Sequence, residues 1–344
     1  MQVRSQSISM FTLLLLASAI AAMAAAFPAS AATTTGCVPA QNIEAIIDDS
    51  GSMLGTDPDA NRVAAIKLLA SKPGNAKKTL GALEFGSGDS WSTPPTPAAV
   101  TLFAPQTIGP NVASIDSILT SNVKGDNGAT DYNAAFALAK TDNPNANARI
   151  FITDGGHNAD PYQNGHTPGP PTYVIGLDIG ASSFDTEADQ RLKQIAADTG
   201  GVYYPDVTKS TIQSVVNQID AALNCQTVAK TFTDVFAKVG QVKKKSVSVP
   251  SNAKSIDLTM TWPSPLDTFT ISKIKLKVKG GPTISIAKKR LRIKRSLGAT
   301  FVNVHIRGVK RGKLSFQLKA KKFGSLGSAT GVTLTTQAVP SRTK

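Results

Sequence analysis

The chain has 344 residues, of which 41% are hydrophobic, and it carries 37 Lys and Arg against 23 Asp and Glu. This length accommodates two ordinary domains, and the hydrophobic content supports packed cores. Two cysteines and three histidines, none in C-x-x-C or H-E-x-x-H spacing, exclude the familiar zinc and redox motifs.

Residues 1–31 have the features of a secretory signal peptide. Arg4 precedes an apolar run over 10–26, and Ala29-Ser30-Ala31 resembles a cleavage site. A membrane anchor is the alternative, but the polar threonines that follow favour removal. No later stretch approaches the roughly 20 apolar residues that span a bilayer. We therefore expect a secreted, extracellular chain without a transmembrane segment after processing, which could associate with a cell surface.

Residues 37–225 alternate short β-like runs with helix-like runs, which predicts an α/β domain with a mostly parallel sheet. The connection over 86–97 is too short for a confident helix, so the second and third strands should form an antiparallel pair. The predicted strands are 43–47, 79–85, 99–103, 149–153, 173–179 and 202–205, and the predicted helices are 61–70, 112–121, 132–140, 184–199 and 211–223.

Following the chain direction brings three polar segments to one edge of this sheet, where open α/β sheets bind ligands. They carry five side chains with oxygen atoms: Asp48, Ser50, Ser52, Thr130 and Asp154. Oxygen ligands suit Mg²⁺ or Mn²⁺, with Ca²⁺ as an alternative at looser geometry. Singly, each residue is better explained as a helix cap or a turn residue. Together, on one edge, they indicate a metal site, from which we leave out Asp49 and Asp131.

The pattern Asp48-x-Ser50-x-Ser52 with Thr130 and Asp154 resembles the metal-ion-dependent adhesion site of von Willebrand factor type A (vWA) domains. The resemblance covers residues 37–225. It implies a Rossmann-like six-stranded sheet of order 3-2-1-4-5-6 with one antiparallel edge strand, a bound Mg²⁺ or Mn²⁺, and capture of a protein ligand through an acidic residue. It implies no catalysis, and the chain contains no G-x-S-x-G motif. The alternative is an accessory or structural envelope protein in which the metal only stabilises the fold.

Other residues of this domain suggest a disulfide and ligand contacts. An even cysteine count in an exported chain favours a bond between Cys37 and Cys225, both at the edge opposite the metal residues. Trp91 and Tyr162 lie in loops that leave the metal edge, and we consider them candidate ligand contacts. We interpret His157 and His166, in the same loop as Tyr162, as ordinary loop residues.

Charge divides the chain near Cys225. Residues 32–225 contain 11 Lys and Arg against 20 Asp and Glu, a net charge of −9, whereas residues 226–344 contain 25 against 3, a net charge of +22. We expect a linker at 226–242 and a basic β-sandwich at 243–344, because short alternating runs are punctuated there by Gly and Pro. Its predicted strands are 246–249, 255–262, 268–278, 283–293, 300–306, 313–319 and 331–336.

Two basic clusters mark this second domain, namely Lys275, Lys277 and Lys279, and then Lys288, Lys289, Arg290, Arg292, Lys294 and Arg295. A solvated face whose lysines oppose aggregation is the ordinary interpretation. Because soluble faces usually mix both signs, we favour association with an anionic envelope polymer, glycan or lipid surface. Nucleic acid is disfavoured because no stacking-aromatic motif accompanies the charge. Docking onto the acidic first domain stays open.

Overall fold

The computed structural model describes residues 37–86, 97–125, 128–158, 161–179, 183–208, 210–285, 292–324 and 330–340. The predicted signal peptide and Trp91 lie outside these residues, as do Lys288, Lys289 and Arg290. Within the described ranges, no helix combines the length and the apolar character needed to cross a bilayer.

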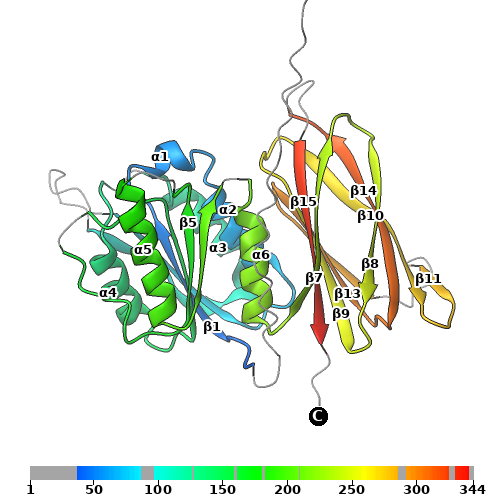
Figure 1. The fold of residues 1–344 in the computed structure, drawn as a ribbon, viewed down its shortest axis with the longest axis horizontal. Helices are drawn as coiled ribbons and strands as arrows, with labels where there is room; N and C mark the ends of the chain where they lie inside the picture. The colour runs from blue at the N-terminus through cyan, green and yellow to red at the C-terminus, as the bar shows by residue number, and fades with distance from the viewer. Residues whose placement is uncertain are drawn as a thin grey trace, which may run out of the picture. The chain divides into compact units, whose positions relative to one another are not determined.

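Six strands form the first sheet, in the order β3-β2-β1-β4-β5-β6 (Figure 1). Every neighbouring pair is parallel except β2 and β3, which are antiparallel. The strands are β1 (Asn42–Asp48), β2 (Thr79–Phe85), β3 (Ala99–Thr107), β4 (Ala148–Thr153), β5 (Thr172–Leu177) and β6 (Val202–Val207). The predicted strand order and the single antiparallel edge strand are confirmed.

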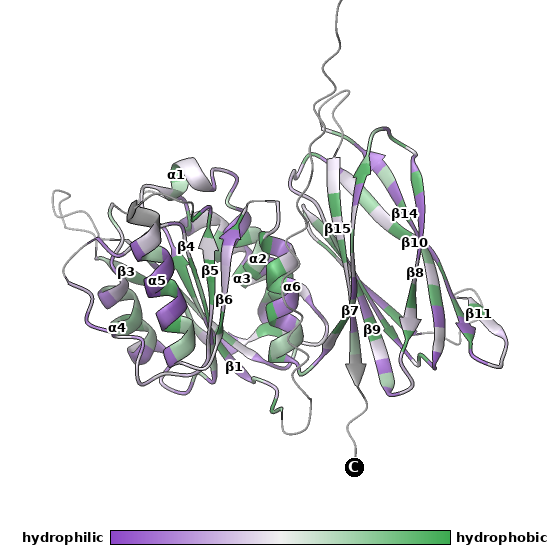
Figure 2. Ribbon diagram, in the orientation of Figure 1, coloured by the Kyte–Doolittle hydropathy of each residue, from purple (hydrophilic) through white to green (hydrophobic). Residues whose placement is uncertain are grey.

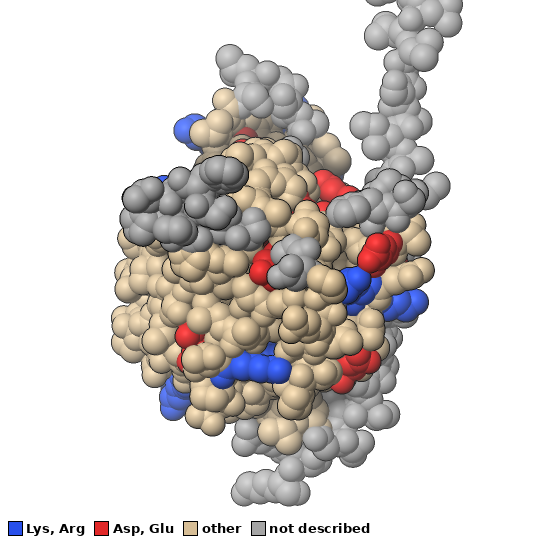
Figure 3. All heavy atoms as spheres, turned by 90° about the vertical axis from the view of Figure 1, so that its left-hand side faces the viewer, with Lys and Arg blue, Asp and Glu red and all other residues tan. Residues whose placement is uncertain are grey.

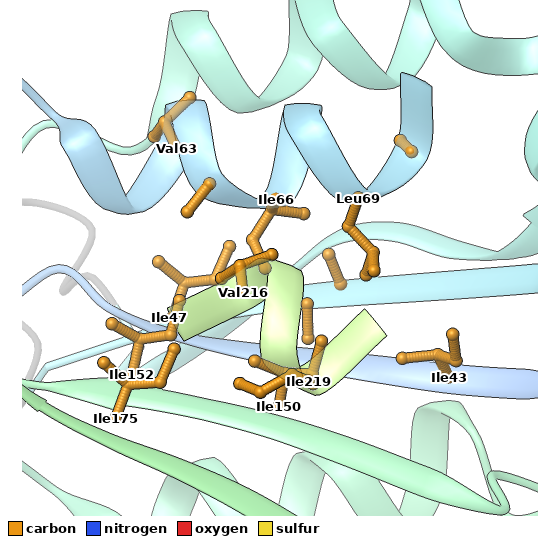
Figure 4. Packing of buried hydrophobic residues seen from close by; sticks show 14 of the residues in the cluster. Ile43, Ile47, Val63, Ile66, Leu69, Ile150, Ile152, Ile175, Val216 and Ile219 are labelled. Carbon is orange, nitrogen blue, oxygen red and sulfur yellow. The ribbon is translucent and has the colours of Figure 1, made fainter. Parts of the chain in front are cut away.

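Helices cover both faces of this sheet. They are α1 (Met53–Thr56), α2 (Asn61–Ser71), α3 (Ile108–Asn122), α4 (Tyr132–Asp142), α5 (Ser183–Asp198) and α6 (Ile212–Leu223). One core joins α2, α3 and α6 to Ile43 and Ile47 of β1, and the other joins α4 and α5 to Ile46. Successive residues of a strand point to opposite faces, so β1 supplies both cores. Figure 4 shows Ile66 of α2 and Val216 of α6 packed near Ile47.

Burial of the central strands positions the candidate site. Residues 43–48 of β1 and all six residues of β4 are buried, as expected for parallel strands covered on both faces. The register aligns Ile47 with Ile152. Asp48 and Thr153, the next residues along each strand, therefore reach the same edge of the sheet, where the polar segments begin.

The remaining strands form two antiparallel sheets, of orders β11-β10-β14-β8 and β12-β13-β9-β15-β7. Their apolar side chains share one core, and Figure 2 shows hydrophobic and hydrophilic residues alternating along these strands. The predicted all-β sandwich is confirmed. The strands are β7 (Thr227–Phe236), β8 (Val242–Val249), β9 (Ala253–Thr261), β10 (Thr268–Val278), β11 (Thr283–Ser285), β12 (Arg292–Leu297), β13 (Phe301–Arg307), β14 (Gly312–Lys322) and β15 (Thr330–Pro340).

Two details differ from the sequence prediction. Residues 227–236, expected in a linker, form β7, which pairs with β15. This strand lies at the edge of its sheet and buries only Asp234 and Phe236, so its hydrophobic pattern is weak. The strand predicted over 283–293 is replaced by β11 and by β12, which pair with different neighbours in different sheets.

Candidate metal centre

The turn after β1 holds a buried carboxylate beside two hydroxyls. Asp48 is fully buried at the end of the strand. The Ser50 amide donates a 2.8 Å hydrogen bond to its Oδ1, and the Thr153 hydroxyl donates a 2.5 Å hydrogen bond to its Oδ2. The Oγ atoms of Ser50 and Ser52 lie 3.1 Å apart. Neighbours on β1 and β4 therefore fix the carboxylate, and the two hydroxyls line the same turn.

Asp154 joins this turn from the end of β4. The Ser52 hydroxyl donates a 2.8 Å hydrogen bond to Asp154 Oδ1. The other oxygen, Oδ2, is buried and has no hydrogen-bond partner among the described residues. A buried acceptor without a partner is costly, and a cation would satisfy it. The side chains of Asp48, Ser50, Ser52 and Asp154 supply only oxygen, so they fit a hard divalent cation.

The electrostatics of Asp48 agree with that fit. The pKa of Asp48 is raised from 3.8 to about 6, mainly by burial and also by the nearby charge of Asp154, while hydrogen bonds from Ser50 and Thr153 oppose the rise. No Lys or Arg is among the groups that shift it. A divalent cation would favour the charged form of both carboxylates.

The second segment, which carries Thr130, is attached to both other segments. The Gly51 amide donates a 2.7 Å hydrogen bond to the Gly128 carbonyl. The Thr130 amide donates to Asn158 Oδ1 at 2.7 Å, and the Asn158 amide donates back to the Thr130 carbonyl at 3.1 Å. Thr130 itself is buried. The structure thus brings together the three segments that carry the five predicted residues.

Asp49 and Asp131, which we left out of the ligand set, have other partners. Arg62, which is 1% exposed, contacts Asp49 Oδ1 at 3.1 Å and Asp57 Oδ2 at 3.3 Å. The Gly125 amide, at φ 82°, also donates to Asp49. Asp131 caps α4 by accepting a 3.0 Å hydrogen bond from the Ala134 amide. These bonds hold the turns on which the site is built.

Residues around Tyr132 support the loop that follows Asp154. The buried Tyr132 hydroxyl donates to the Gly155 carbonyl, and its amide donates to His157 Nδ1 at 3.0 Å. Its ring packs edge-on against Phe151 of β4, with centroids 5.0 Å apart. His157 is therefore part of the support of the loop rather than an ordinary loop residue.

Tyr162 is held by contacts within the chain. Its hydroxyl lies 2.6 Å from His166 Nδ1, and His166 Nε2 lies 3.1 Å from Asp198 Oδ2. His166 is fully buried, so our interpretation of it as an ordinary loop residue is wrong. Tyr162 packs edge-on against Tyr132 at 5.8 Å. The hydroxyl of this candidate ligand contact is thus engaged by His166.

No family model and no curated protein matches this chain. Solved structures do match it at the level of the fold. The von Willebrand factor type A protein from Catenulispora acidiphila is 14% identical with a TM-score of 0.42, over 87% of this chain and 58% of that one. Proximal thread matrix protein 1 from the mussel byssus is 16% identical with a TM-score of 0.42, over 59% of this chain and 51% of that one.

A third neighbour, the pilus adhesin SpaC from Lactobacillus rhamnosus GG, is 10% identical with a TM-score of 0.44, over 88% of this chain and 44% of that one. The chain thus spans little more than half of the first two proteins and less than half of the third. Likenesses this weak carry no functional information. The fold of the first part of the chain is shown instead by its strand order together with the antiparallel β2–β3 pair and the helices on both faces of the sheet. This part of the chain has the vWA fold.

The predicted disulfide is present in this vWA fold. Cys37 precedes β1 and Cys225 follows α6, and the bond joins them with their Cα atoms 5.9 Å apart. A hydrogen bond of 2.9 Å from the Ala40 amide to the Leu223 carbonyl lies near it. The two ends of the vWA fold are therefore tied together at the strand starts, away from the carboxyl ends of β1 and β4.

The basic residues singled out in the sequence lie in two different sheets. Lys275 and Lys277 are exposed on β10, and Lys279 follows that strand, whereas Arg292, Lys294 and Arg295 belong to β12. The Arg295 guanidinium donates a 2.9 Å hydrogen bond to the Ile271 carbonyl of β10. On the face of the molecule that Figure 3 shows, the described Lys, Arg, Asp and Glu side chains lie scattered, with both signs present.

Proposed function

We propose that this chain is a secreted, non-catalytic binding protein whose vWA fold holds a protein partner through a divalent metal ion. Asp48, Ser50, Ser52, Thr130 and Asp154 would hold the ion. The buried Oδ2 of Asp154, which has no partner among the described residues, is the observation that supports this most strongly. Mg²⁺ or Mn²⁺, with Ca²⁺ as the alternative, would supply positive charge and a coordination position open to an acidic group of the partner.

The chain's own residues prepare this site. The hydrogen bonds from Ser50 and Thr153 orient the Asp48 carboxylate. Arg62 forms ion pairs with Asp49 and Asp57 next to this turn. Metal sites depend on such outer residues to keep the ligands in place. These contacts would orient the ligand side chains before a partner binds.

The basic β-sandwich would associate with an anionic envelope polymer, glycan or lipid surface. Its sequence has only three acidic residues, and all three are engaged. Asp234 contacts Lys243 and Lys245, and Asp257 contacts His305. Asp267 accepts hydrogen bonds from Gly324 and Thr330. The other basic residues are thus left without an acidic counterpart in this part of the chain, and a dense surface of one sign concentrates opposite charge.

The test compares Asp48→Ala with Asp59→Ala, which removes an exposed carboxylate of the same region. Both variants and the wild type are panned against a display library of extracellular protein fragments, in Mg²⁺ and in EDTA. The proposal expects fragments retained by the wild type and Asp59→Ala in Mg²⁺, released by EDTA, and not retained by Asp48→Ala. If Asp48→Ala keeps its fold and retains the same fragments, the metal has no part in binding, which would favour a purely structural role.

A further inference from the structure

One end of the β-sandwich contains a cavity of about 1030 Å³. Its walls come from both sheets, because β7 and β15 of one sheet and β8, β10 and β14 of the other contribute residues. The turns that follow β8, β10 and β13 complete it. Its volume lies at the upper end of the range of about 300 to 1,000 Å³ that is usual for small-molecule pockets. It could therefore hold several units of an oligomeric ligand.

Four basic residues line this cavity: Lys277, Lys279, Arg311 and Lys313. Lys277 of β10 and Lys313 of β14 are directly opposite each other in the antiparallel ladder, and both are exposed. Like charges in that position destabilise a sheet. A 2.9 Å backbone hydrogen bond from Lys279 to the Arg311 carbonyl brings the other two positions together. Leu276 and Leu314, their neighbours in the chain, are buried in the core, so the two lysines project from the outer face of the sheet at the edge of the cavity, where the fold gathers positive charge.

No negative charge of the chain compensates these four residues within the cavity. All of the lining residues are described, and none of them is acidic. The three acidic residues after Cys225 are engaged with other groups, as set out above. A ligand with several negative charges would therefore be attracted to the cavity and to the lysines at its edge.

The neutral lining combines apolar residues, among them Val228, Val249 and Val278, with four polar ones. Thr227, Ser248, Ser251 and Asn252 add hydroxyl and amide groups beside the four cations, and these groups pair with neutral hydroxyls of a ligand. None of the lining residues is aromatic, so the cavity offers no stacking platform for the bases of a single-stranded nucleic acid. The large exposed hydrophobic residues of the sandwich, which could insert into a bilayer, do not line it.

We propose that this cavity binds a segment of an acidic oligosaccharide, a chain that carries several carboxylate or sulfate groups together with free hydroxyls. The four cations would pair with the anionic groups, and the hydroxyl and amide groups would bind the neutral part of the sugar. This deepens the proposed association of the basic sandwich with an anionic surface by naming its site and ligand class. It is independent of the metal site.

The experiment uses the chain from residue 32 to 344 in EDTA, so that the metal site cannot contribute. Calorimetry measures binding of a heparin-derived hexasaccharide, which is sulfated, and of hexagalacturonate, which carries only carboxylates. The cavity variant is Arg311→Gln/Lys313→Gln. The matched control, Lys244→Gln/Lys275→Gln, removes two exposed lysines of the same sheet that do not line the cavity. Circular dichroism verifies that both variants fold.

We expect the wild type to bind one or both hexasaccharides with one-to-one stoichiometry. The cavity variant should bind at least tenfold more weakly, and the control should stay within about twofold of the wild type. Equal weakening of both variants would overturn the cavity site but leave a general anionic association intact. Binding of anionic vesicles or single-stranded DNA, with no binding of either hexasaccharide, would overturn the ligand class. No binding of any anion would end both proposals.

Discussion

The hydroxyl of Ser52 donates a 2.8 Å hydrogen bond to Oδ1 of Asp154, across 102 positions of sequence. This contact joins the turn after β1 to the end of β4, and it leaves Asp154 Oδ2 buried with no partner among the described residues. The second carboxylate, Asp48, is held by Ser50 and Thr153 at the same edge. An all-oxygen group with one unsatisfied carboxylate oxygen is the structural basis for the proposed metal site.

Thr130 tests the contribution of the second segment. Thr130→Ala removes the hydroxyl but keeps the backbone hydrogen bonds to Asn158. We expect Mn²⁺ affinity to fall roughly tenfold, equivalent to about 1.4 kcal/mol, whereas Thr130→Ser, which keeps the hydroxyl, should stay close to the wild type. Paramagnetic relaxation of water protons measures bound Mn²⁺ in each protein. Similar affinities for the Ala and Ser variants would remove Thr130 from the ligand set.

Arg62 is expected to be a stability determinant beneath the site. Arg62→Met would leave the buried carboxylates of Asp49 and Asp57 without this cation, and the loss of one partner from a buried ion pair typically costs about 3 to 5 kcal/mol. Urea denaturation measures the change. The control on the same helix is Lys67→Met, whose ion pair with Asp116 is half-exposed and should contribute less than about 1 kcal/mol. Equal losses for the two variants would contradict this role.

Glu44 gives the vWA fold a pH-dependent stability. The pKa of Glu44 is raised from 4.5 to about 8, mainly by burial and also by the nearby charge of Asp142, while the Asn143 hydrogen bond and the charge of Arg149 oppose the rise. Between these two values the folded chain keeps a proton that the unfolded chain has lost. The contribution of this proton to the free energy of unfolding is complete below about pH 4.5. It is lost as the pH rises towards 8, by up to about 1.4 kcal/mol per pH unit.

Glu44→Gln removes this titration. Its unfolding free energy should fall less than that of the wild type between pH 5 and pH 8, as urea denaturation at the two values would show. Other titrating groups are common to both proteins, so the difference between the two slopes reports on Glu44. Parallel slopes would show that Glu44 is ionised in the folded chain.

The disulfide between Cys37 and Cys225 should stabilise the vWA fold mainly by restricting the unfolded chain. It closes a separation of 188 positions, for which the chain-entropy relation gives about 5 kcal/mol. Cys37→Ser/Cys225→Ser should lose that amount in urea denaturation, and each single variant should lose about as much, because one missing thiol already prevents the bond. A loss below about 1 kcal/mol in the double variant would contradict the expectation.

Much of the vWA fold could be predicted because its signals are local. The alternation of β-like and helix-like runs, with a short connection over 86–97, fixed strand directions and so the edge at which Asp48, Thr130 and Asp154 meet. In the sandwich, β10 could be predicted because buried and exposed residues alternate along it. β7 could not, because an edge strand that buries two of its ten residues resembles a polar linker.

The contacts that hold the site residues in place could not be predicted from the sequence, because they join residues that are remote in the chain. Thr153 hydrogen-bonds Asp48 from a different strand, and Asn158 holds Thr130 across 28 positions. Arg62 gives no local signal that it pairs with Asp49. The position of Thr153, directly before Asp154 at the end of a buried strand, could have indicated that it lies at the site. The contacts of His166 with Tyr162 and Asp198 likewise require the tertiary structure.

The central claim is that the oxygens around Asp154 bind a divalent cation, and calorimetric titration with Mg²⁺ and Mn²⁺ tests it most directly. We expect the wild type to bind one ion per chain, and Asp154→Asn, which removes the charge but keeps the shape, to bind at least roughly tenfold more weakly. Asp59→Ala should bind as the wild type does. No uptake of either ion by the wild type, or equal uptake by Asp154→Asn, would contradict the claim.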